Sequence, residues 1–117
     1  MVLEITPEEF DDLVSLALDS VPPKLLALLD NVVVLTAAES PRPGPQLYGL
    51  YEGVPLTSRG ANPAGTIPDR ITIFRGPIVR SCFTYSEVVN QVRITVIHEL
   101  AHHFGIDDAR LHELGWG

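Results

Sequence analysis

The chain has 117 residues, of which 45% are hydrophobic, and this suits one domain with a sizeable core. Its formal net charge is −7, from 15 acidic and 8 basic residues, so nucleic-acid phosphates and anionic lipids are poor partners for it. The N-terminus has no basic start, no apolar run reaches the roughly 18 residues of a membrane span, and the single cysteine, Cys82, allows no internal disulfide. We therefore expect a single domain over residues 1–117, in the cytoplasm.

The N-terminal region predicts a helix that ends near a proline pair. Thr6 and Glu9 have the spacing of a capping box, and Pro7 occupies the first helical position. Apolar residues at helical spacing then continue to about Ser20, where Pro22-Pro23 stops the pattern. A further short helical turn is expected over Lys24–Asp30.

Three segments predict strands, which makes the expected fold class α+β. The β-branched run Val32–Thr36 is typical of a buried strand, and Leu47–Tyr51 and Arg70–Phe74 are the next two candidates. The second and third strands are separated by Gly53–Asp69, a Gly- and Pro-rich stretch longer than most connections in a compact domain. Long connections of this kind are often functional.

A long helix beginning at Ser86-Glu87 carries the most informative pattern, a HExxHxxGxxD run. Four residues advance a helix by little more than one turn, so His98 and His102 project from the same face and can hold one metal ion. Glu99 lies about 100° further round, where its carboxylate reaches a metal-bound water as a general base. Catalytic zinc has three protein ligands, and Gly105 permits the left-handed turn that brings Asp108 back as the third.

Other residues near this run leave alternatives open. Four residues compete with Asp108 for the third-ligand position: His103, which adjoins His102 but points about 100° away, and Asp107, His112 and Glu113. Asp107 also suits the cap of a short terminal helix over Ala109–Leu114. His103 and His112 are expected to face solvent or to support a ligand from outside the metal site.

Residues 98–108 resemble the extended zinc motif of the metzincin clan, in the variant with aspartate as third ligand. With the Pro7-Glu8-Glu9-Phe10 helix start and the segments 47–51 and 71–75, the whole chain resembles the small bacterial zincin-like metallopeptidases, the mini-zincins. It departs from the larger clan because its sole methionine, Met1, precedes the zinc motif and leaves no Met-turn. The resemblance implies a minimal zincin-like fold with an N-terminal helix, a small three-stranded sheet, a long active-site helix and a short C-terminal helix.

The resemblance also implies a way to bind substrate. In zincin-like folds an edge strand above the metal pairs with an extended peptide, and 47–51 is the candidate here, with Tyr51 as the side chain most expected to face the cleft. An ordinary strand with two half-buried tyrosines is the alternative.

The sequence therefore predicts a zinc-dependent metallopeptidase that hydrolyses peptide bonds with a water activated by Glu99. The alternative is a catalytically silent or latent zinc protein that binds a peptide or partner. A glutamate beside an open metal site argues against that alternative, because a purely structural site needs no base.

Overall fold

The computed structural model describes residues 3–27, 29, 31–41, 47–54, 68–106 and 108–113, without the side chains of residues 108, 111 and 112. Eight elements follow in chain order: α1 (Pro7–Asp19), α2 (Pro23–Leu26), β1 (Val32–Ala37), β2 (Gly49–Glu52), β3 (Asp69–Phe74), α3 (Arg75–Arg80), α4 (Tyr85–Phe104) and α5 (Asp108–Glu113). None of the described helices is long and apolar enough to cross a membrane.

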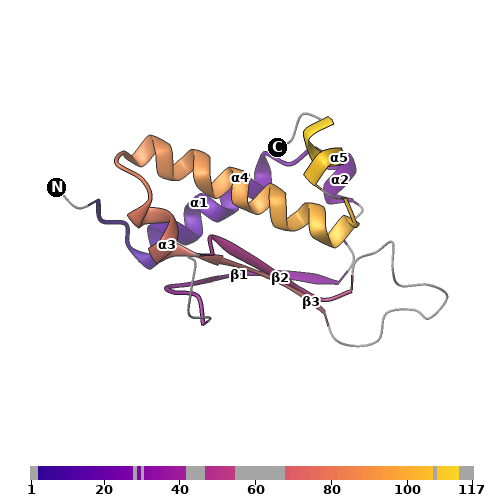
Figure 1. Ribbon diagram of the computed structural model, residues 1–117, viewed down its shortest axis with the longest axis horizontal. Coiled ribbons are helices and arrows are strands. Elements are labelled where there is room, and N and C mark those ends of the chain that lie inside the picture. Colours follow the sequence, from indigo (N-terminus) through magenta and orange to yellow (C-terminus); the bar gives the residue numbers. More distant parts are fainter. Residues whose placement is uncertain are drawn as a thin grey trace.

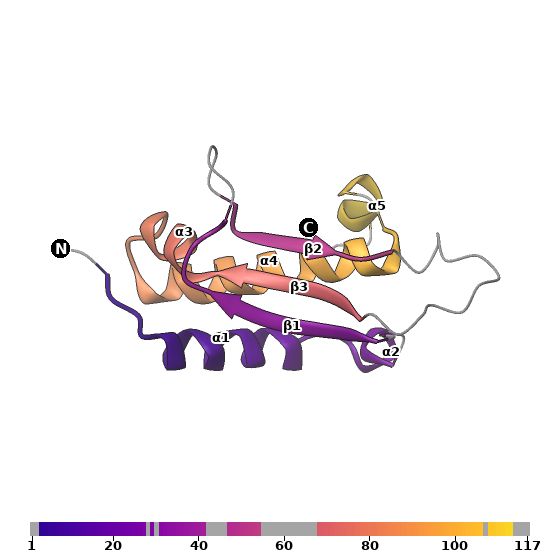
Figure 2. The same cartoon turned by 90° about the horizontal axis from the view of Figure 1, so that it is seen from below.

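The strands form one mixed sheet with the order β1-β3-β2. The central strand β3 runs parallel to β1 and antiparallel to β2. Figure 1 shows α1 and α4 on the same side of this sheet, and Figure 2 shows the strands crossing in front of α4 while α1 lies along β1. The predicted α+β class, with a three-stranded sheet and a long helix near the C-terminus, is confirmed.

The N-terminal helix begins as predicted. The Thr6 hydroxyl accepts a hydrogen bond from the Glu9 backbone N–H, and the Glu9 carboxylate accepts one from the Thr6 N–H, so the capping box is complete. The buried side chains of α1 are Phe10, Leu13, Val14 and Ala17. They meet buried α4 side chains and the isoleucines of β3, and this contact forms the core that holds α4 against the sheet.

The prediction that 32–36 is a buried strand is wrong. The segment is a strand, but it lies at an edge of the sheet, and Val33 and Leu35 are 39% and 46% exposed. Only alternate residues of an edge strand face the helices, because successive side chains point to opposite faces. In a continuous run of β-branched residues, polar and apolar positions do not alternate. Such a run therefore does not show whether one face of the strand is exposed.

The short helix α3 was not predicted. It follows β3 directly, and its Gly76 N–H donates to the Ala38 carbonyl just after β1. Arg80 at its end makes two 2.7 Å bonds to the Glu39 carboxylate. The Arg80 guanidinium holds the pKa of Glu39 below its usual value, mainly through these hydrogen bonds. Contacts distant in sequence therefore fix this helix.

The long helix α4 begins and ends with recognisable caps. At its start the Thr84 side chain accepts from the Glu87 N–H. At its end Gly105 has φ +81°, the left-handed conformation, and its N–H donates to the His102 carbonyl while the Ile106 N–H donates to the Ala101 carbonyl. These two bonds form a Schellman motif, so the predicted reversal of the chain at Gly105 is confirmed.

Candidate metal centre and adjoining groove

Two histidine rings are neighbours on the accessible side of α4. The ring centroids of His98 and His102 are 4.8 Å apart, with their planes tilted by 55°. The His102 side chain is 43% exposed, and His98 is half-buried. Helical spacing alone places the rings together, and their exposure leaves room for an ion that both can bind.

Glu99 lies on the flank of this histidine pair, between α4 and β2. It is only 6% exposed, and its Oε1 atom lies 3.6 Å from His102 Nδ1. A Cβ atom on Gly49 of β2 would lie 3.0 Å from Glu99 Cγ and 3.1 Å from its Oε2. The carboxylate is therefore held beside the imidazoles by a strand that approaches closely because it has glycine at this point.

The third predicted ligand is placed only by its backbone. The Gly105 turn reverses the chain, and Asp108 opens α5. The side chain of Asp108 and the whole of Asp107 lie outside the described residues, as does the side chain of His112. Glu113, another of the alternatives, is exposed and pairs with Arg110 at 3.0 Å. The choice of Asp108 stays a prediction.

The two imidazoles fit a zinc ion. With Zn–N bonds of about 2.1 Å and a tetrahedral angle, two rings on one ion have centroids about 5 Å apart, close to the separation of His98 and His102. Among the side chains that the structure describes, no group of three or more His, Cys, Asp and Glu can hold a metal ion. The predicted third ligand is not among those side chains.

An open groove of about 310 Å³ runs between β2 and α4 and reaches His98, the first histidine of the pair. It is lined by Leu47, Tyr48, Gly49, Gln91, Ile94, Thr95, His98 and Glu99. Gln91 and Ile94 are not among the predicted site residues, although they precede His98 by seven and four positions. Helical spacing places residues at those intervals on the same face as His98, so this signal was available.

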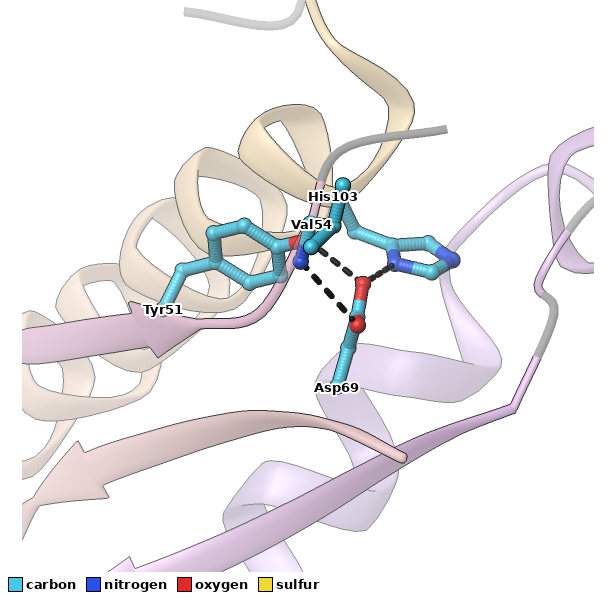
Figure 3. Close-up of polar contacts among 4 residues, drawn as sticks. All are labelled: Tyr51, Val54, Asp69 and His103. Atoms are coloured by element: carbon cyan, nitrogen blue, oxygen red, sulfur yellow. Dashed lines mark hydrogen bonds and ion pairs between the residues drawn. The ribbon is translucent and has the colours of Figure 1, made fainter. Parts of the chain in front are cut away.

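A buried polar network lies beside the other side of the histidine pair (Figure 3). The Asp69 side chain is 5% exposed, and its Oδ2 atom accepts hydrogen bonds from the Tyr51 hydroxyl at 2.5 Å and from His103 Nδ1 at 2.8 Å. Its Oδ1 atom receives the Val54 N–H at 3.3 Å. Of the two places expected for His103, exposure to solvent is wrong, because its side chain is fully buried, and a supporting place outside the metal site stays a prediction. Its partner Asp69 lies 34 positions away, and no local pattern links the two.

Tyr51 makes contacts that the sequence did not indicate. It is half-buried, its hydroxyl bonds to Asp69, and its ring meets the His102 ring edge-on at 6.2 Å. The tyrosine that lines the groove is Tyr48. A direct contact of Tyr51 with substrate stays a prediction.

Comparisons with known proteins agree with this geometry. Residues 29–116 match the family model described as zincin-like metallopeptidase. A solved structure of a conserved hypothetical protein from Thermo thermophilus is similar, with a TM-score of 0.55, 24% identity, and coverage of 94% of this chain and 97% of that chain. At this identity the likeness establishes a shared fold alone. Curated proteins give no significant match.

Proposed function

This chain belongs to the zincin-like metallopeptidase family, and we propose that it is a zinc-dependent peptidase that hydrolyses peptide bonds. The observation that carries the proposal is the position of a buried carboxylate, Glu99, beside two accessible imidazoles at one end of a groove. Structural zinc sites are closed by four protein ligands and need neither a groove nor a base.

The proposal assigns His98, His102 and Asp108 to zinc. A bound zinc ion supplies Lewis-acid stabilisation of the charge that develops on the scissile carbonyl, and it lowers the pKa of water toward neutrality. Glu99 accepts the proton of the attacking water and then delivers it to the leaving amine. Because Glu99 packs against Gly49, its carboxylate is held in position before substrate arrives.

The groove suits an extended peptide. The strand β2 lies at the edge of the described sheet, and the groove between it and α4 leads to Glu99. Edge strands bind extended peptides by adding one more strand, with side-chain pockets supplying specificity. We propose peptides or proteins as substrates, in the cytoplasm, and the net charge of −7 disfavours nucleic acid and anionic membranes as partners.

The test is cleavage of a mixed peptide library, read by mass spectrometry, with the bound zinc of each sample measured in parallel. Glu99→Gln should retain zinc and lose about 10²-fold or more in cleavage rate, because it removes the base and leaves the ligands. A chelated sample should be inactive and regain activity with zinc. Glu87→Gln is the matched control, because it neutralises a carboxylate on the same helix that lies far from the histidines and accepts hydrogen bonds only from Phe83 and Thr84 among the described contacts.

Firm binding of one zinc ion without cleavage would reject the peptidase proposal. The chain would then be a catalytically silent or latent zinc protein whose groove binds a peptide or partner. Cleavage that survives in Glu99→Gln would reject the role of Glu99 and leave the zinc assignment intact.

A further inference from the structure

We propose that Tyr51 is a positioning residue for the zinc ligand His102, and that Asp69 and His103 hold Tyr51 in place. The inference rests on the proposed function, because it assigns His102 to zinc. It gives Tyr51 a role that involves no contact with substrate.

The Tyr51 ring contacts the rings of two histidines on α4. The Tyr51 ring, on β2, meets the His102 ring at a centroid distance of 6.2 Å and an interplanar angle of 81°, and it meets the His103 ring at 6.2 Å and 71°. Edge-to-face contacts with centroids about 4.5–7 Å apart are a preferred geometry for aromatic side chains. The His102 ring therefore has two aromatic neighbours, the His98 ring with its centroid at 4.8 Å and the Tyr51 ring with its centroid at 6.2 Å.

Tyr51 is itself anchored through its hydroxyl. Its hydroxyl and His103 Nδ1 both bond to Oδ2 of Asp69, whose side chain is 5% exposed, and the His103 side chain is completely buried. The three residues come from β2, β3 and α4 (Figure 3), so one carboxylate joins three elements around the tyrosine. Buried, fully bonded side chains have little freedom to change rotamer.

The backbone that follows β2 packs closely against Asp69. A Cβ atom on Gly53, which follows β2, would lie 2.3 Å from Asp69 Oδ1, and the backbone there has φ +154°. The backbone thus closes directly over the carboxylate, and the next residue, Val54, donates its N–H to the same Oδ1 atom. Asp69 is fixed from the side of β2 as well as from α4.

The physical consequence concerns the freedom of His102. Its side chain is 43% exposed, and an exposed imidazole exchanges between rotamers unless a neighbour restricts it. A ring held in one orientation binds metal more tightly because less freedom is lost on binding. Residues that orient a ligand from outside the coordination sphere typically change metal affinity by about 10–100-fold.

The experiment compares zinc affinity and stability in the full chain. Tyr51→Leu removes the ring, Tyr51→Phe removes only the bond to Asp69, and Val88→Ala is the control, a buried residue near the opposite end of the helix that carries His102. For each protein, zinc Kd is measured by competition with a chelating dye, cobalt geometry by visible absorption, and the stability of the metal-free form by urea denaturation.

We expect Tyr51→Leu to raise the zinc Kd about tenfold or more and to alter the cobalt spectrum, with Tyr51→Phe between it and the wild type. Val88→Ala should lower the urea midpoint and keep the wild-type Kd. If Tyr51→Leu does not fold, Tyr51→Phe carries the test, because it removes one hydroxyl and keeps the ring.

Three results would overturn the inference. A Tyr51 variant that loses stability like Val88→Ala but keeps the wild-type Kd and cobalt spectrum would make the network purely structural. A raised KM for peptide cleavage, measured on the same variants, together with an unchanged zinc Kd would make Tyr51 a substrate contact. Failure of the wild type to bind zinc would end both this inference and the proposed function, whereas the first two results leave the proposed function standing.

Discussion

Replacing Gly49 with alanine tests how closely β2 packs on α4. A Cβ atom there would lie 2.8 Å from Thr95 Cγ2 and 3.0 Å from Glu99 Cγ. Carbon atoms in favourable contact stay about 3.5–4.0 Å apart, so either the strand or the two helix side chains must move. Overpacking of this kind costs about 1–3 kcal/mol. We expect about 2 kcal/mol, since Thr95 and Glu99 are both buried.

Urea denaturation measures this cost. For a small domain with a denaturant slope of about 2 kcal/mol per molar, a loss of about 2 kcal/mol lowers the urea midpoint by about 1 M. Peptide cleavage by the folded variant should fall as well, because the new methyl group displaces the Glu99 carboxylate from its place beside the histidines. Activity is compared at a temperature at which both proteins are fully folded.

Thr95→Ser provides the control. It removes Cγ2, the nearest atom to the new methyl group, and keeps the hydroxyl that donates to the Gln91 carbonyl at 2.8 Å. The double variant Gly49→Ala/Thr95→Ser should recover part of the lost stability, with a coupling of about 0.5 kcal/mol or more. An unchanged midpoint in Gly49→Ala, or strictly additive effects in the double variant, would refute the packing argument.

Three further predictions concern the buried network, the end of α4 and the Glu39–Arg80 pair. Asp69→Ala should lower the free energy of unfolding by about 3 kcal/mol, because buried His103 loses its partner, and wild-type stability in urea would contradict this. Gly105→Ala should cost about 1–2 kcal/mol by the same assay, since its φ of +81° disfavours a side chain, and no loss would count against that strain. Arg80 lowers the pKa of Glu39, so the ion pair stabilises the fold fully at pH values above the ordinary carboxyl pKa. This stabilisation is lost as the pH falls through the lowered pKa of Glu39. NMR titration should find a higher Glu39 pKa in Arg80→Gln, and equal values in both proteins would contradict the assignment.

Local rules predicted the parts of this fold that local contacts determine. The capping box of Thr6 and Glu9 and the left-handed Gly105 depend on residues a few positions apart, and both are present. The proximity of the His98 and His102 rings has the same origin, because four residues make about one helical turn.

The sequence could not indicate features that depend on contacts distant in the chain. The edge position of β1 is set by the insertion of β3 between β1 and β2, and the helix α3 is tied to residues 38 and 39. From the sequence, Asp69 is predicted to end the connection that begins at Gly53. In the structure its carboxylate bonds to His103 on α4 and to Tyr51 on β2. Each of these depends on tertiary packing, which a local pattern does not encode.

The strand order has a consequence for how the chain is made. The central strand is the last of the three to leave the ribosome, and in the described sheet β1 and β2 pair only with it. A nascent chain that stops before residue 69 therefore has two strand segments without their hydrogen-bonding partner, and unpaired strand edges are sites of aggregation. The helix α4, which completes the cover over these strands, follows β3 in the chain, so the sheet, the groove and the histidine pair can form only after α4 has been synthesised. A short peptide with the sequence of α4 would therefore not reproduce this site. The Glu99 carboxylate is held by β2, and β2 is paired only when β3 is present.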